Sequence, residues 1–243
     1  MTNYTQWKSL VDLHEYSAIP DSEGDHQYNA TAGTGTTLED VIGSLDGDIQ
    51  GASWQSGVGA GDTYLLYDGD EDVTDLPGSE SELSYLSVGQ GTIILWIRPD
   101  SNDRGGIAGV SSSDSDDGPF LDWQEEDELR FDWIIDGTRY KVMASPGAPT
   151  GTWFPVMLTG SGSGGSSTAY WADPSDNYNV ESLGTVSLPS ATESDLPETM
   201  RLGRIRAGDV TFPGAQDIVV FDNEEWSESR FQSFVDDSKG FYQ

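Results

Sequence analysis

The sequence predicts an all-β protein, a two-sheet antiparallel β-sandwich with one short helix near its C-terminus. Short apolar segments alternate with polar residues at a period of two, and clusters of Gly, Ser, Asp, Asn and Pro separate them. No long helical segments lie between the strands, which argues against a parallel sheet of βαβ units. The 243 residues include 8 Trp, 10 Tyr and 8 Phe, enough for one sizeable core. We therefore expect a single domain over residues 1–243, with an N-terminal arm (1–7) and a C-terminal tail (239–243).

The clearest strand is residues 92–97, a nearly continuous apolar run (TIILWI) typical of a buried central strand. In residues 129–135 apolar and polar side chains alternate, and Asp136-Gly137 then gives the signal of a two-residue type I′ turn. Residues 139–143 complete this β-hairpin. Further strands are predicted at residues 8–16, 63–67, 153–159, 168–172, 200–205 and 215–221.

One helix is predicted near the C-terminus. Ser227 can cap an amphipathic helix that carries Phe231, Phe234 and Val235 on one face and ends at Lys239-Gly240. A second short turn is predicted at residues 81–86. The run GSGSGGSS at 160–167 has strand patterns on both sides, which favours a mobile hairpin loop over a linker between domains.

The net charge of the chain indicates the solvent in which it works rather than the kind of partner that it binds. With 43 Asp and Glu against 11 Lys and Arg, the net charge of -32 excludes ordinary binding to nucleic acid or to anionic membranes. The one cationic cluster, MRLGRIR at 200–206, is interpreted as a strand face paired with acids rather than as a phosphate site. The acids are spread evenly, and at molar salt a Debye length of roughly 3 Å screens their repulsion. We therefore expect a protein of a halophile.

Two absences limit the chemistry further. There is no cysteine, so disulfides, thiolate metal sites and cysteine nucleophiles are excluded. No segment is long and apolar enough to span a bilayer, and the N-terminal residues have no apolar signal core. We expect synthesis in the cytoplasm without an export signal.

The order of five segments resembles the laminin G-like, concanavalin A-like jelly-roll family. The segments are DVIGSLDGDIQGASW (40–54), YLLYDGDEDVTDLP (64–77), GTIILWIRPDS (91–101), GTWFPVMLTGSGSGGSSTAYWAD (151–173) and MRLGRIRAGDVTFPGAQDIVVFDNEEWSESRFQSF (200–234). The resemblance covers residues 8–238 and implies a sandwich of twelve or more strands. Pro155 departs from the family pattern and, because it lacks a ladder donor, suggests an edge strand or a bulge. This fold hosts enzymes, lectins and structural modules alike.

The sequence argues against an enzyme. Related glucanases carry a Glu-x-Asp-x-x-Glu strand, but the nearest match here, residues 125–128, has Arg130 where the third acid would stand. Residues 124–130 are better explained as an exposed turn that leads into the hairpin. Of the two histidines, His14 falls in a predicted strand and His26 in an Asp/Gly-rich loop, and neither has a nucleophile signature nearby.

The resemblance makes Ca²⁺ the most plausible cofactor, because laminin G-like folds often bind it at the rim of the sandwich through carboxylate and carbonyl oxygens. An EF-hand is excluded, since the twelfth position counted from Asp68 is Ser79 rather than Glu. Chance spacing of acids is the alternative in so acidic a chain. The matching positions are Asp46, Asp48, Asp68, Asp70, Asp72 and Asp217.

Sugar binding would need exposed aromatic rings beside polar groups. The candidates are Trp123, Tyr170, Trp171 and Tyr178, because all four flank predicted loops. Strand alternation requires Tyr170 and Trp171 to face opposite sides. The alternative is that these rings belong to the core or to subunit contacts.

Together these observations favour a non-catalytic structural or recognition protein on the particle of a haloarchaeal virus, such as a turret, capsid decoration or tail-fibre module. It would be exposed on the virion, contact other virion proteins and attach to host surface glycans. We expect a homo-oligomer, with contacts through Tyr4, Trp7, Phe241 and Tyr242. The alternatives are an adhesion module of a haloarchaeal cell-surface protein and a glycan-active enzyme.

Overall fold

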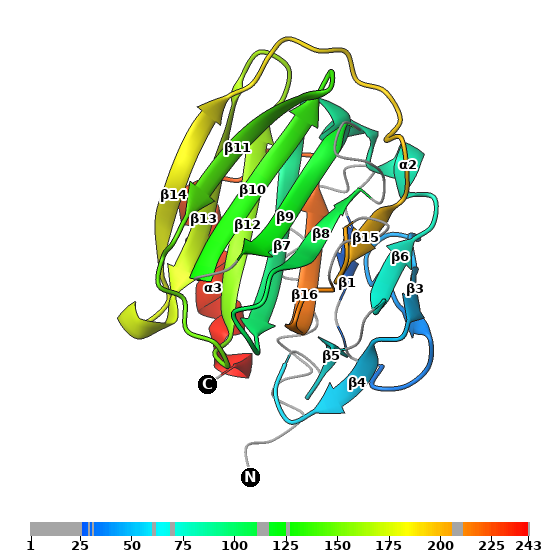
Figure 1. Cartoon of the computed structure of the whole chain (residues 1–243), viewed down its shortest axis with the longest axis vertical. Coiled ribbons are helices and arrows are strands. Elements are labelled where there is room, and N and C mark those ends of the chain that lie inside the picture. Colours follow the sequence, from blue (N-terminus) through cyan, green and yellow to red (C-terminus); the bar gives the residue numbers. More distant parts are fainter. Residues whose placement is uncertain are drawn as a thin grey trace.

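The chain folds into a sandwich of two antiparallel sheets, which confirms the predicted fold class (Figure 1). The computed structural model describes residues 26–28, 30, 32–59, 62–68, 71–110, 117–124, 127–205 and 211–242. The predicted strand at 8–16, with His14, and the arm with Tyr4 and Trp7 lie outside these residues.

The first sheet, sheet A, has the strand order β14-β13-β12-β7-β16-β5-β4, and β1 also pairs with β16. Its strands are β1 (His26–Tyr28), β4 (Ser53–Ser56), β5 (Thr63–Tyr67), β7 (Gln90–Pro99), β12 (Phe154–Ser161), β13 (Ser166–Asp173), β14 (Asn179–Ser187) and β16 (Gly214–Asp222).

The second sheet, sheet B, has the order β11-β10-β9-β8-β15-β6-β3-β2. In Figure 1 its strands β9 to β11 lie in front of β12 to β14 of sheet A. Its strands are β2 (Thr37–Leu38), β3 (Gly47–Gln50), β6 (Val73–Leu76), β8 (Gly105–Val110), β9 (Gly118–Gln124), β10 (Glu128–Ile135), β11 (Thr138–Ala144) and β15 (Met200–Leu202).

The predicted hairpin is β10–β11. Asp136 and Gly137 have φ values of 50° and 68°, the left-handed pair that a type I′ turn requires. The Gly/Ser run also forms a hairpin loop, since β12 ends at Ser161 and β13 begins at Ser166. Both predicted hairpins are therefore confirmed, because the residues of a short turn and its flanking strands specify it without distant contacts.

Two strand predictions need correction. The strand predicted at 200–205 ends at Leu202, because Gly203 turns the chain at a φ of 77°. Pro155 is not at an edge: β12 lies between β7 and β13. Pairing of β12 with β13 begins at Val156, so the missing N–H of Pro155 falls outside that ladder.

Apolar side chains form two layers. The larger lies between the sheets, and the smaller lies on the outer face of sheet A beneath helix α3 (Glu228–Ser238). Phe231, Phe234 and Val235 of α3 are buried against Trp96 and its neighbours in this second layer, as the sequence predicts. A single turn, α2 (Ser79–Glu82), precedes β7. No helix in the described part of the chain is long and apolar enough to cross a membrane.

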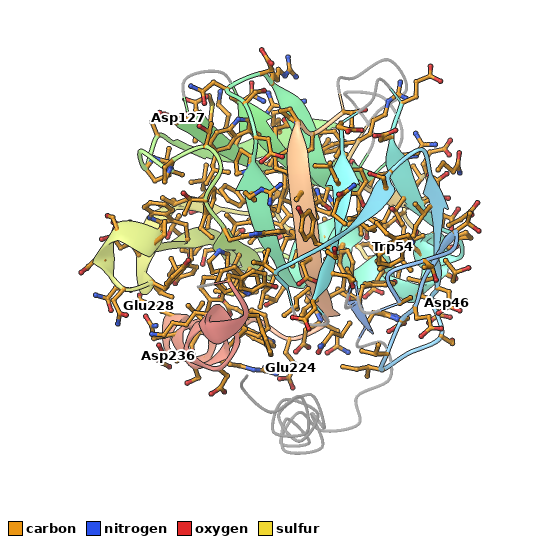
Figure 2. All side chains as sticks on the ribbon, turned by 90° about the horizontal axis from the view of Figure 1, so that it is seen from below. Asp46, Trp54, Asp127, Glu224, Glu228 and Asp236 are labelled. Carbon is orange, nitrogen blue, oxygen red and sulfur yellow. The ribbon has the colours of Figure 1, made fainter. Side chains whose placement is uncertain are left out.

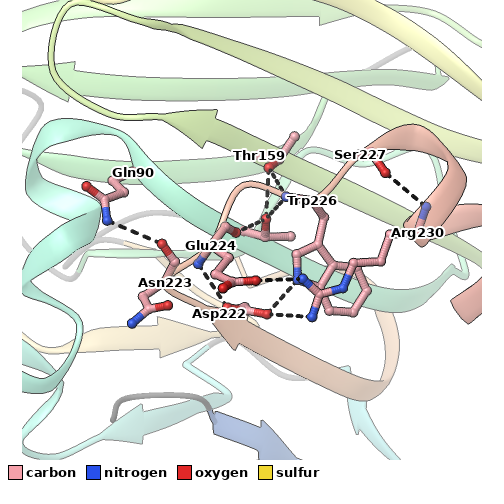
Figure 3. A network of polar contacts seen from close by, with 9 residues as sticks. Gln90, Thr159, Asp222, Asn223, Glu224, Trp226, Ser227 and Arg230 are labelled. Atoms are coloured by element: carbon pink, nitrogen blue, oxygen red, sulfur yellow. Dashed lines mark hydrogen bonds and ion pairs between the residues drawn. The ribbon is translucent and has the colours of Figure 1, made fainter. Parts of the chain in front are cut away.

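A polar network fixes the start of α3 to sheet A (Figure 3). The buried Asp222 carboxylate accepts the Trp226 Nε1–H at 2.6 Å and an Arg230 N–H at 3.1 Å. The Arg230 guanidinium lies 3.9 Å from the centre of the Trp226 ring, and the Ser227 hydroxyl caps the helix by accepting the Arg230 backbone N–H. These contacts orient the helix over the sheet.

The C-terminal residues continue this layer. Tyr242 is buried, its ring is stacked on Trp96 at 4.0 Å, and its hydroxyl donates to Asp217 at 2.8 Å. The prediction that Tyr242 is a subunit contact is therefore wrong for this fold, because the ring packs within its own chain.

Candidate ligand-binding face on sheet B

Three of the four aromatic residues predicted to stack on sugars are buried. Trp123 and Trp171 both pack against Phe154 in the core between the sheets, with ring centres 6.4 and 5.8 Å from that of Phe154. Tyr178 is buried in the layer beneath α3. The expectation of exposed rings is wrong for these three. Trp123 and Trp171 lie at strand positions that alternate into the core, and Tyr178, just before β14, packs with Trp96 at a ring-centre distance of 5.6 Å. Tyr170 is partly exposed on the opposite face from Trp171, as alternation requires.

The predicted calcium ligands are dispersed. Asp48 is exposed on β3 of sheet B, whereas Asp217 is buried in sheet A and accepts bonds from the Tyr242 hydroxyl and the Ala30 N–H. Asp46 accepts the Asp40 N–H. Asp72 accepts the Asp68 N–H, and Asp70 lies outside the described residues. Within the described ranges, no three His, Asp or Glu side chains gather as a metal-binding group.

His26 lies in strand β1 and not in a loop. Its ring is buried against Asp40, with Nδ1 2.5 Å from a carboxylate oxygen. Burial alone would raise the pKa of Asp40, but hydrogen bonds from His26 and from the N–H groups of Leu45 and Gly43 outweigh burial and lower the pKa to about 2. The pair clamps a loop to β1 and presents no nucleophile.

Strands β9, β10 and β11 carry a row of charged side chains on the outer face of sheet B. Phe131 and Trp133 of β10 point into the core, so Arg130 and Asp132, which alternate with them, point outward. Pairing in register places Asp122 of β9 opposite Arg130, and Lys141 of β11 opposite Asp132. We call this the charged face. The same register also places Phe120 and Ile134 on this side of the sheet, where both are buried. The charged and polar residues of the face, together with Met143, are Asp122, Gln124, Glu128, Arg130, Asp132, Arg139 and Lys141.

An ion network joins the three strands. Arg130 bridges both acids: its Nη2 pairs with Asp122, and its Nε lies 3.2 Å from Asp132. Arg139 lies 3.3 Å from the same Asp132 oxygen. The side chains of Asp132 and Asp122 are 0% and 2% exposed, and those of Arg130 and Arg139 are 12% and 31% exposed.

The position of this network is unusual for a structural role. Buried ion pairs cost desolvation energy that their attraction often fails to offset, and the outer face of a sheet can be built from solvated residues instead. A fixed set of carboxylate and guanidinium groups is, in contrast, suited to hydrogen bonding with polar ligands. The Gln124 side-chain N–H group is also buried with no acceptor among the described residues.

The charged face is separate from the helix-covered side of the molecule. Figure 2 shows Asp127, in the turn between β9 and β10, across the sandwich from Glu228 and Asp236 of α3. Asp127 has a φ of 61°. The exposed turn predicted at 124–130 is too long, because Gln124 ends β9 and Glu128 already begins β10, in which Leu129 is buried and the Arg130 side chain is 12% exposed. Sequence reasoning missed the charged face, although charges at alternate positions in RFD (130–132) and RYK (139–141) indicate it.

Comparison with protein families matches residues 68–230 to the model of the concanavalin A-like lectin/glucanases superfamily, of the laminin G type. The chain belongs to this superfamily. A comparison with curated proteins found no match.

Solved structures with similar folds come from proteins of several kinds. The carbohydrate-binding module CBM40 of the Ruminococcus gnavus IT-sialidase aligns with a TM-score of 0.54 at 13% identity, over 70% of the present chain and 95% of the module. Trypanosoma rangeli sialidase aligns with a TM-score of 0.65 at 14% identity, over 95% of this chain but 37% of the sialidase. The binding domain of botulinum neurotoxin serotype D aligns with a TM-score of 0.61 at 16% identity, over 90% of this chain and 52% of the binding-domain chain. At these identities the likeness shows the fold.

Proposed function

We propose that this protein is a non-catalytic glycan-binding module and that the charged face is its binding site. The observation that carries the proposal is the buried network of Asp122, Arg130 and Asp132 on the outside of a sheet. The buried acids hold the guanidinium groups of Arg130 and Arg139, whose side chains are 12% and 31% exposed, in fixed positions. Guanidinium groups held in this way can bond sugar hydroxyls without the cost of ordering them on binding. Support by analogy comes from the CBM40 module, whose structure has been solved with α2,3-sialyllactose.

The same network supports the non-catalytic part of the proposal. Glycoside hydrolysis usually needs one carboxyl group as acid and a second as base or nucleophile. Here Asp122 and Asp132 both form ion pairs with Arg130, which suits binding better than proton transfer. Incubation with a panel of glycosides tests this: release of reducing sugar that Asp132→Asn abolishes would contradict the proposal.

The biological setting we propose is the particle of a haloarchaeal virus, where the module would attach to host surface glycans. The net charge of -32 and its even spread support a brine environment. A cell-surface adhesion module is the alternative setting. Neighbouring genes for capsid or tail proteins would support the viral setting, and genes for surface-layer or secretion proteins would contradict it.

The direct test of glycan binding is a glycan array probed in molar NaCl with wild-type protein and two variants. Arg139→Gln removes a charge from the network. Arg201→Gln is the matched control, because Arg201 lies on the same sheet, pairs with Asp75 and has a side chain 25% exposed against 31% for Arg139. We expect Arg139→Gln to weaken binding at least tenfold, as for loss of a charged hydrogen bond, and Arg201→Gln to leave it unchanged. No binding by wild type, or equal losses in both variants, would contradict the proposal.

A further inference from the structure

The charged face has a different charge balance from the rest of the protein. The chain has 43 acids and 11 cations, so a face chosen at random would carry about four acids per cation. The charged face instead carries three cations, Arg130, Arg139 and Lys141, and three acids, Asp122, Glu128 and Asp132. Counted over the described residues of β9 to β11 that point outward, it is neutral, whereas the chain as a whole has a net charge of -32.

The charges are also ordered by depth. Asp122 and Asp132 are buried, whereas Lys141 is exposed and Arg139 is half-exposed. Glu128 is partly buried at the end of the face beside Gln124. A molecule that approaches the middle of the face therefore meets cations first, with the acids behind them.

The two outer cations are spaced to hold one anionic group. Arg139 and Lys141 are two residues apart on β11, so their side chains leave the same face with Cα atoms about 6.5 Å apart. Arg139 is held by its contact with Asp132, its side chain is 31% exposed, and its planar guanidinium group has the geometry that suits a carboxylate. Lys141 adds a flexible point charge. Both side chains are long enough to meet over the space between them.

A neutral ligand would suit this arrangement poorly. Covering Lys141 with an uncharged sugar removes water from its ammonium group without supplying a counter-charge, which is unfavourable. A carboxylate supplies that charge. The side chain of Met143, 42% exposed at the next outward position of β11, offers an apolar contact to the adjoining part of the sugar.

From these observations we infer that the charged face selects sugars that carry a carboxylate over neutral sugars, with Arg139 and Lys141 as the residues that determine specificity. The inference rests on the proposed glycan-binding function and adds the ligand class to it. The overall charge of -32 does not oppose it at contact, since in molar salt that repulsion is screened beyond roughly 3 Å.

Calorimetric titration in 1 M NaCl with oligogalacturonate and with the same oligomer after reduction of its carboxyl groups tests the inference. We expect the acidic oligomer to bind at least tenfold more tightly than the reduced one. Lys141→Met should remove most of that difference. Lys239→Met, which removes the same charge from the end of α3 where Lys239 pairs with Asp236, should leave it intact.

The outcomes separate the inference from the function on which it rests. Equal binding of both oligomers would overturn the carboxylate selectivity and leave glycan binding standing. Selectivity that survives Lys141→Met and Arg139→Gln would overturn the assignment to these residues. If neither oligomer binds and the glycan array is also silent, the proposed function and the inference both fail.

Discussion

The buried pair of His26 and Asp40 gives a quantitative prediction for Asp40→Asn. The Asp40 carboxylate is buried and accepts hydrogen bonds from the N–H groups of Gly43 and Leu45, at 2.9 and 3.0 Å, as well as the contact with His26. These bonds lower its pKa from 3.8 to about 2. That difference corresponds to about 2 kcal/mol of folding stability at neutral pH. We expect Asp40→Asn to lower the free energy of unfolding by about this amount.

The sign of the pH dependence follows from the lowered pKa. The contribution of Asp40 is complete above pH 3.8 and is lost as the pH falls toward about 2, where the folded protein also protonates the group. Urea unfolding in molar NaCl, followed by tryptophan fluorescence at pH 7, 4 and 2.5, measures this. The wild-type advantage over Asp40→Asn should shrink across that interval. Asp100→Asn, in an exposed pair with Arg98, is the control and should change stability by under about 1 kcal/mol. An advantage that is absent at pH 7 or constant with pH would refute the reasoning.

Three further predictions concern packing, the helix junction and the metal. Gly203→Ala should destabilise the fold by about 3 kcal/mol, because its φ is 77° and a Cβ there would lie 2.1 Å from the Tyr67 ring. The control is Gly147→Ala, which has a similar φ of 76° but open space around it and should cost about 1 kcal/mol. Equal losses of stability in the two variants on urea titration would argue against the clash with Tyr67. Asp222→Ala should cost about 3 kcal/mol, because it leaves the buried Trp226 Nε1–H without its acceptor and leaves Arg230 with Glu224 as its remaining carboxylate partner among the described residues. A melting temperature unchanged from wild type would argue against this role of the junction. Calcium binding by the predicted aspartates remains a prediction: adding Ca²⁺ after chelation should raise the melting temperature, and no rise would count against it.

The sequence predicts those parts of the fold that local chemistry determines. The alternation in residues 129–135 and the Asp136-Gly137 turn specify the hairpin, and the capping Ser227 with its apolar face specifies α3. Strand β14 (Asn179–Ser187) was not predicted because most of its side chains are partly or fully exposed, which leaves no apolar periodicity. The sequence of β8 (Gly105–Val110), GGIAGV, also shows no alternation of apolar and polar residues, because three of its positions are glycines that neighbouring residues approach closely.

The candidate site was harder to predict than the fold. The positions of Trp123 and Trp171 beside loops predict ligand contacts, but their side chains belong to the core between the sheets. The charged face depends on three strands lying in register, and only the β10–β11 half of that register follows from the sequence. Asp122 reaches Arg130 through pairing of β9 with β10, across a turn whose length the sequence does not specify.

The central claim is that the charged face binds glycan, and the most direct measurement is the affinity of one glycan for wild type, Arg139→Gln and Arg201→Gln in molar NaCl. Melting temperatures of the three proteins, measured alongside, separate loss of binding from loss of fold. The account predicts that Arg139→Gln weakens binding at least tenfold while Arg201→Gln matches wild type. Folded Arg139→Gln protein that binds as tightly as wild type would contradict it.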